Sequence, residues 1–200
     1  MPSVNKLFLA LAAVVLLGVG APIAKADDCT VAGNIVTNCG FETGTFAGWT
    51  QSGNTGFTGV FAGDAHSGAF GAEFGPVGSL GFITQNLVTV PGQTYNLSFW
   101  LSNLSGTPTN QFTASFNGVT LTTLTNSAVF AYTQFTFNGL LATTASTQLQ
   151  FGFRHDPSSW LFDDVVVRPA GQVVPEPATL FLLGTGLLGV EAKYRRKLRR

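Results

Sequence analysis

The sequence predicts an all-β protein, a two-sheet β-sandwich of the jelly-roll type, with an apolar segment on either side of it. Three observations lead to this fold class. Short segments alternate between apolar and polar residues, and Gly, Thr, Ser and Asn separate these segments. No long stretch repeats with the period of a helix. Eighteen phenylalanines supply bulky side chains to fill the space between two sheets.

Eight to ten strands are expected, which is enough for two packed sheets. The domain they form is expected to span residues 27–169. Its strands are expected near residues 35–37, 57–61, 70–74, 80–88, 94–103, 112–116, 119–121, 128–137, 147–154 and 160–169. Asn117-Gly118 separates two of these runs and suits the positive φ angles of a tight hairpin turn.

The alternation also assigns side chains to faces, because neighbouring residues in a strand point to opposite sides of the sheet. The inward set is expected to include Tyr95, Leu97, Phe99, Leu101, Leu149, Phe151 and Phe153. In residues 128–137, Phe130 is expected to share a face with Tyr132 and Gln134, opposite Phe135 and Phe137.

Residues 1–26 are expected to be a secretory signal peptide. Lys6 gives a positive start, residues 7–20 form an unbroken apolar run, and Ala24 and Ala26 flank Lys25 in the pattern that signal peptidase cuts. A transmembrane anchor is the alternative, but the run is short for a hydrocarbon core of about 30 Å. The sequence therefore predicts export, with cleavage after Ala26.

Export gives the two cysteines a role, because disulfides persist in oxidising compartments. Cys29 and Cys39 are ten residues apart with no histidine near them, which is a poor pattern for zinc. We expect them to form a disulfide.

Charge is unevenly distributed along the chain. Residues 27–174 contain eight acidic and two basic residues, a net charge of −6, whereas residues 193–200 contain six basic ones. An acidic domain lacks the cationic surface that phosphate contacts require, so nucleic-acid binding is excluded as its function.

The C-terminal region has three parts. A linker over residues 170–177 contains Pro175, Glu176 and Pro177, an apolar run over 178–190 follows, and the basic residues come last. This arrangement resembles the PEP-CTERM sorting signal of Gram-negative bacteria. The resemblance implies processing by an exosortase, a membrane enzyme linked to exopolysaccharide-producing systems. It also implies a hydrophobic helix in 178–200 that holds the precursor in the inner membrane, with the basic residues in the cytoplasm, before release to the cell surface or extracellular matrix.

Two ends of the domain resemble carbohydrate-binding and galactose-binding-like jelly rolls. Asn38, Gly40, Phe41, Glu42 and Trp49 match an opening in which Asn-Gly-Gly-Phe-Glu and a tryptophan are usual, with Cys39 in place of a glycine. The segment 162–165 is similar to the closing strand of the same modules.

The resemblance implies a structural calcium ion bound by Glu42, Asp163 and Asp164. Calcium takes carboxylate oxygens, and few cationic side chains are available in the domain to neutralise these acids. The other interpretation is that the acids cap turns or accept backbone N–H bonds. Strand alternation allows only one of Asp163 and Asp164 to face a given side, and both assignments stay open.

Three function classes remain. The first is a non-catalytic module that binds extracellular polysaccharide through Trp100, Tyr132, Gln134, Gln150 and Arg154, which fall on the polar faces of the central strands; the alternative for the aromatic pair is packing under a loop. The second is a purely structural surface or matrix protein. The third, a hydrolase, is disfavoured, because His66 and His155 lie in no nucleophile signature and nothing pairs Glu42 with Glu73. Both histidines are expected to be ordinary loop or surface residues.

Overall fold

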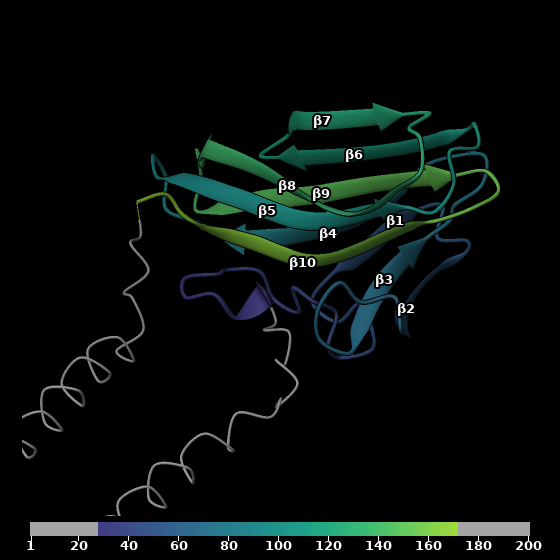
Figure 1. The fold of residues 1–200 in the computed structure, drawn as a ribbon. Helices are drawn as coiled ribbons and strands as arrows, with labels where there is room; N and C mark the ends of the chain where they lie inside the picture. The colour runs from purple at the N-terminus through teal and green to yellow at the C-terminus, as the bar shows by residue number, and fades with distance from the viewer. Residues whose placement is uncertain (1–27, 172–200) are drawn as a thin grey trace, which may run out of the picture.

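Two antiparallel sheets of five strands each pack face to face in the computed structural model, which describes residues 28–171 (Figure 1). The first sheet has the order β1-β4-β9-β6-β7 and the second β2-β3-β10-β5-β8. The strands are β1 (Thr50–Gly53), β2 (Thr58–Ala62), β3 (Phe70–Phe74), β4 (Gly81–Val88), β5 (Thr94–Asn103), β6 (Asn110–Phe116), β7 (Val119–Thr125), β8 (Phe130–Leu141), β9 (Ser146–His155) and β10 (Trp160–Pro169). The predicted all-β sandwich is confirmed.

The core lies between the sheets and consists of the residues that the alternation places inward. Leu97, Phe99 and Leu101 on β5 are fully buried, and so are Phe151 and Phe153 on β9. Burying one such side chain stabilises the fold by about 1.5–3 kcal/mol. Period two along single strands therefore predicted the inward residues of β5 and β9, one central strand of each sheet.

Two strand predictions were wrong at the N-terminal side of the domain. Residues 35–37 form no strand, because the amides of Val36 and Thr37 bond to the side chains of Asn34 and Gln85 rather than to a neighbouring strand. Strand β1 was not predicted. Its sequence, TQSG, is exposed throughout, so it has no apolar residue to show an inward face.

The hairpin between β6 and β7 is confirmed, with φ of 54° at Asn117 and 75° at Gly118. The face assignment of Phe130 was wrong. Leu101 pairs with Thr133 but Asn103 pairs with Phe130, so β8 has one extra residue between these pairs. This bulge turns Phe130 toward the core while Tyr132 stays on the outer face.

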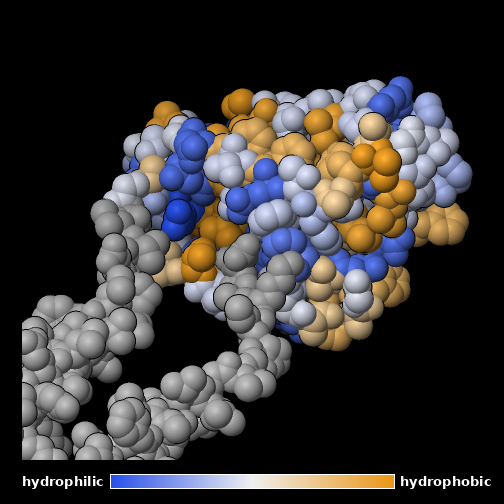
Figure 2. Space-filling model, in the orientation of Figure 1, coloured by the Kyte–Doolittle hydropathy of each residue, from blue (hydrophilic) through white to orange (hydrophobic). Residues whose placement is uncertain are grey.

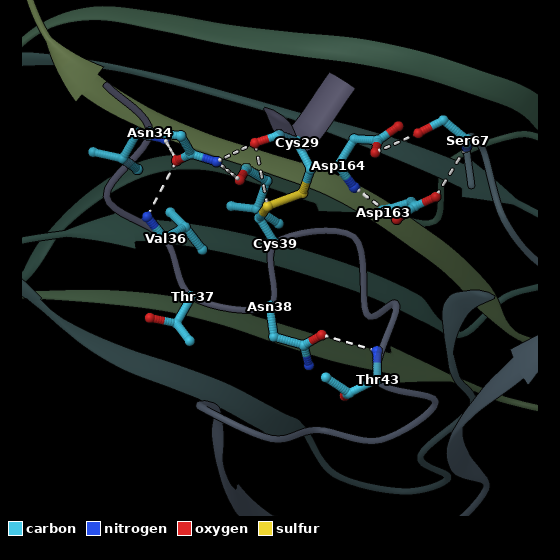
Figure 3. Close-up of a disulfide and its surroundings, with 12 residues drawn as sticks. Cys29, Asn34, Val36, Thr37, Asn38, Cys39, Thr43, Ser67, Asp163 and Asp164 are labelled. Carbon is cyan, nitrogen blue, oxygen red and sulfur yellow. Dashed lines mark hydrogen bonds between the residues drawn. A yellow bond between two sulfur atoms is a disulfide. The ribbon is translucent and has the colours of Figure 1, made fainter. Parts of the chain in front are cut away.

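The predicted disulfide joins Cys29 to Cys39 with an S–S distance of 1.98 Å (Figure 3). Asn34 lies beside it and connects this segment to β10. Its amide nitrogen donates to the carbonyls of Cys29 and Val165, at 3.1 and 3.3 Å, and its side-chain oxygen accepts from the N–H of Val167 at 3.0 Å. The disulfide thus closes the N-terminal segment on itself, and the Asn34 side chain and backbone hydrogen bonds of Ile35 and Cys39 hold that segment to the last strand.

Replacing both Cys29 and Cys39 with serine is expected to lower the free energy of unfolding by about 2–3 kcal/mol, because the unfolded chain regains the freedom that the short closed loop removes. Urea unfolding of the oxidised protein and of the double variant measures this difference. A reductant should destabilise the native protein alone; equal destabilisation of the variant would contradict the disulfide as the cause.

The segments predicted to direct export and sorting lie outside the described residues. These are the signal peptide with Ala24 and Ala26, the Pro175-Glu176-Pro177 motif, and residues 178–200. Between residues 28 and 171, the structure has no helix with the length and apolar character needed to cross a bilayer.

Candidate functional site

The five residues predicted to form one glycan platform lie on two different sheets. Trp100 on β5 pairs with Gln134 on β8, and Tyr132 shares their outer face. Gln150 and Arg154 are on β9, which is paired with β4 and β6 in the other sheet. The single platform predicted from the sequence is therefore not formed, because sheet membership separates its aromatic and polar halves.

The loop between β2 and β3 covers the aromatic half. The ring of His66 stacks on Trp100 with 3.7 Å between centroids and an angle of 15°, and it meets the ring of Tyr132 edge-on at 5.3 Å. The Tyr132 hydroxyl donates to the carbonyl of Asp64 at 2.5 Å. Burial and the charge of Asp163 raise the pKa of Tyr132, so it remains a neutral donor. Trp100 and Tyr132 thus pack under a loop, as the alternative interpretation had it.

His66 lies in the β2–β3 loop, in agreement with the expectation of a loop residue, but it is not an ordinary surface residue. Its side chain is 11% exposed, and Nδ1 lies 2.6 Å from Asp164 Oδ2. The neighbouring Ser67 donates through Oγ to Asp164 Oδ1 at 2.7 Å, and the amides of His66 and Ser67 both donate to Asp163 Oδ2 (Figure 3). The β10 acids therefore hold the centre of the β2–β3 loop.

The third predicted calcium ligand holds the end of the same loop. Glu42 is exposed, and its carboxylate accepts the amides of Ala69 at 3.0 Å and Phe70 at 3.1 Å. No group of three or more Asp, Glu, His or Cys side chains within residues 28–171 is placed to share a metal ion. Glu42 and Asp163 accept backbone N–H bonds, as the second interpretation expected, whereas Asp164 interacts with the side chains of Ser67 and His66, and calcium binding stays a prediction.

Asp163 is in an unusual electrostatic environment, since its side chain is fully buried beside Asp164. Burial first, and the neighbouring charge second, raise the pKa of Asp163 to about 8. The amides of Ser67, Asp164 and His66 act in the opposite direction. The Asp163 carboxyl therefore resists ionisation at neutral pH.

Of the remaining predicted polar residues, Gln150 and Arg154 have partners within the protein. Gln150 donates to Thr84 Oγ1 at 3.2 Å, and Arg154 is paired with Asp156 at 2.6 Å. Gln134 lines two shallow hollows of about 180 and 190 Å³ that share Ser98, Val166 and Arg168. None of these places offers an exposed aromatic ring.

Exposed aromatic rings do occur at the edge formed by β2 and β3. Large apolar residues reach the surface in separate patches, as the face seen in Figure 2 shows. Among the exposed large apolar residues of the described chain, Phe57 and Phe61 are the two aromatic ones, at 80% and 49% exposure. They line a hollow of about 420 Å³ together with Thr58, Glu73, Gly75, Val77, Pro157, Ser158 and Ser159. Two aromatic rings thus border a hollow that also contains a carboxylate and hydroxyl groups.

Glycines shape this aromatic pocket, the hollow lined by Phe57, Phe61 and Glu73. A Cβ on Gly59 would collide with the ring of Phe61, so the absence of a side chain lets the ring lie over the strand. A Cβ on Gly75 would be 2.8 Å from Ser159 Oγ. The β2–β3 edge and the β9–β10 loop can therefore meet at the floor of the pocket.

Phe57 is held in a costly conformation. Its φ is 52°, in the left-handed region that costs a residue other than glycine about 1 kcal/mol or more. The ring is not part of the buried core that would offset this cost. An exposed aromatic ring on a strained backbone is a common feature of ligand-contacting loops.

Glu73 is on β3, opposite Gly59 in the strand pairing, and is half-buried. Partial burial and then the charge of Glu73 raise the pKa of Asp64, so the two acids lie close enough to interact. This pocket was not predicted from the sequence, because residues 57–61 were expected only to form a strand. The alternation Phe-x-Gly-x-Phe was the available signal, because a glycine between two aromatic residues on one face leaves room above the strand.

Comparisons with known proteins assign the domain to a family and its fold to known structures. Residues 33–160, which include the aromatic pocket, match the family model described as a carbohydrate binding domain, and residues 173–197 match the PEP-CTERM protein-sorting motif. The chain is 34% identical over 86 residues to endo-1,4-β-xylanase A of Thermoanaerobacterium saccharolyticum. That alignment covers 42% of this chain and 7% of the xylanase.

Solved structures share the fold. TmCBM61 in complex with β-1,4-galactotriose is 18% identical with a TM-score of 0.57, over 68% of this chain and 98% of that one. The CBM22-1 xylan-binding domain of Paenibacillus barcinonensis Xyn10C is 18% identical with a TM-score of 0.51, over 72% and 99%. Since the family model spans more than half of the residues, the chain belongs to the carbohydrate binding domain family and also carries a PEP-CTERM sorting motif.

Proposed function

We propose that this protein is an exported, non-catalytic polysaccharide-binding protein and that the aromatic pocket is its binding site. One observation carries the proposal: Phe57 and Phe61 are exposed beside a hollow that contains Glu73. The family match supports glycan binding in general, and the pocket is where the described surface offers the chemistry for it.

The pocket combines the two kinds of contact that a sugar makes. The C–H faces of a sugar ring pack against Phe57 and Phe61, and burial of each aromatic contact contributes about 1 kcal/mol. Sugar hydroxyls donate to the carboxylate of Glu73, a charge-assisted bond that is stronger than a neutral one. Ser158 and Ser159 add hydroxyl groups at the opposite wall.

The lining of the pocket supports a binding role rather than hydrolysis. Glycoside hydrolysis ordinarily uses two carboxyl groups about 5–10 Å apart on either side of the scissile bond. Glu73 is the one acid among the residues that line the pocket. Glu42, the other acid considered for such a pair, is engaged with the amides of Ala69 and Phe70.

The proposal is tested by retention of the purified protein on a panel of immobilised polysaccharides, with soluble oligosaccharides as competitors. Retention on at least one polymer, reversed by the matching oligosaccharide, is expected. No retention on any polymer would contradict the proposal and leave a structural role in the matrix as the remaining candidate.

The sorting motif supports the rest of the proposal. Exosortase recognises the segment around Pro175, Glu176 and Pro177 at the inner membrane, and the protein then reaches the cell surface or the exopolysaccharide matrix. Removal of residues 195–200 is expected to release most of the precursor from the membrane fraction, because fewer basic residues then hold the apolar run in place. Fractionation of cells that express each form measures this, and unchanged retention would contradict the role of the basic residues.

We also propose that calcium binds at Asp163 and Asp164, without Glu42. The buried Asp163 carboxyl, whose pKa is raised by burial and by the neighbouring Asp164, supports this, because a divalent cation would favour its ionised form. A rise in melting temperature with calcium, absent in Asp163→Asn, is the expected result; no change in the native protein would contradict it.

A further inference from the structure

Glu73 and Asp64 differ from the other acidic side chains whose contacts the structure gives. The carboxylates of Glu42, Asp156, Asp163 and Asp164 each accept hydrogen bonds from amides or side chains. Within residues 28–171, neither Glu73 nor Asp64 has a hydrogen bond or ion pair through its carboxylate. The pocket therefore contains one acid without a donor, Glu73, and a second such acid, Asp64, is close enough to interact with it.

No cation of the described chain compensates them. Arg154 forms an ion pair with Asp156, and Arg168 lines the hollow that contains Ser98 and Gln134, on the β5 side of β10. A half-buried carboxylate with another acid close by gains free energy when a positive group replaces water beside it. The pocket is consequently expected to bind a ligand that carries a positive charge more tightly than a neutral one.

We propose that the aromatic pocket selects glycans that carry a free amino group, in the form of 2-amino-2-deoxy sugar residues with a protonated amine. This inference rests on the proposed function, since it assigns a ligand class to the same site. The ammonium group donates to the Glu73 carboxylate while the C–H face of the same sugar packs on Phe61. Asp64 adds attraction at longer range.

The same arrangement determines what the pocket rejects. N-acetylation removes the positive charge and leaves only neutral contacts. A uronic acid brings a second negative charge next to Glu73 and Asp64, and like charges in a partly buried site repel. The expected order of affinity is therefore amino sugar, then neutral or N-acetylated sugar, then uronate.

The test compares four oligosaccharides of equal length, built from glucosamine, N-acetylglucosamine, glucose and a uronic acid. Titration calorimetry with the full purified protein, in a buffer containing a metal chelator, gives each affinity. We expect about tenfold tighter binding of the glucosamine oligomer than of the N-acetylated one. Glu73→Gln, which keeps size and hydrogen bonding, should remove that preference, because it weakens binding of the glucosamine oligomer about tenfold more than binding of the neutral oligomers.

Asp156→Asn is the matched control, because it removes one negative charge from the same domain but from a carboxylate already paired with Arg154. It should leave the preference unchanged, whereas Asp64→Asn should reduce it partly. A preference lost equally in Asp156→Asn would indicate general attraction to an acidic protein and overturn the inference. Melting curves confirm that each variant is folded.

The outcomes separate this inference from the proposed function. Neutral oligomers that bind with no amino-sugar preference, and with no effect of Glu73→Gln, would overturn the inference and leave the proposed function standing. Failure of all four oligomers and of every polymer would overturn the proposed function. A preference that appears only when divalent cations replace the chelator would assign the carboxylates to a metal and overturn the amino-sugar inference.

Discussion

The double variant Phe57→Ala/Phe61→Ala is expected to lose polysaccharide binding while keeping its fold. Both rings are exposed and lie outside the buried core, so their removal uncovers little of it. Two stacking contacts of about 1 kcal/mol each amount to about 2 kcal/mol, or roughly thirtyfold in affinity. Affinity electrophoresis or calorimetry measures the loss, and urea unfolding measures the stability.

Trp100→Ala is the informative comparison, because it removes an aromatic residue that was predicted from the sequence to bind the glycan. Its ring stacks with His66 under the β2–β3 loop, so we expect a loss of about 2–3 kcal/mol in unfolding free energy with binding retained in the folded protein. The opposite result, in which Trp100→Ala loses binding and the phenylalanine double variant does not, would move the site to the outer face of β5 and β8.

The difference between these two sites shows what the sequence can predict. The inward positions of β5 and β9 follow from alternation within one strand, which is a local property. Sheet membership is not local. Strand β9 lies between β4 and β6 in the first sheet, whereas β8 and β10, its neighbours in the chain, belong to the second. This placement separates Gln150 and Arg154 from Trp100.

Polar residues that are buried by several loops are equally hard to predict. His155 was expected to be an ordinary loop or surface residue, but it is fully buried, with Nε2 2.9 Å from both Asn103 Oδ1 and the carbonyl of Ser105, and Nδ1 accepting the amide of Ser158. Asn103 and Ser105 lie about fifty residues before His155 in the chain, and only the tertiary fold brings them to it. No spacing of residues in the sequence predicts these contacts of His155.

The stability of the domain is expected to decrease as the pH rises from 6.5 to 8. Most acidic side chains have the opposite effect, because their pKa values are lower in the folded protein than in the unfolded chain. The pKa of Asp163 is raised from its ordinary value to about 8 by burial and by Asp164. Between these two values the folded protein holds a proton that the unfolded chain releases. Raising the pH therefore favours the unfolded chain, by about 1.4 kcal/mol per pH unit for one proton.

His155 acts in the opposite direction at lower pH. Burial lowers its pKa below 6.5, so the folded protein excludes a proton that the unfolded chain binds. Its contribution is present above pH 6.5 and is lost as the pH falls below that value. The effects of Asp163 and His155 thus oppose each other below pH 6.5, and above 6.5 the contribution of His155 no longer changes with pH.

The measurement is urea unfolding at half-unit steps from pH 5 to 8.5 in the presence of a chelator. A decrease of about 2 kcal/mol between pH 6.5 and 8 is expected for the native protein, since one proton is released over 1.5 pH units. Asp163→Asn cannot ionise and should show a flat profile in that range. Calcium, if it binds the ionised carboxylates as proposed, should abolish the decrease because it favours the charged form in the folded protein. A native profile that is flat in chelator would mean that Asp163 is ionised in the fold, with the amides of His66, Ser67 and Asp164 outweighing its burial.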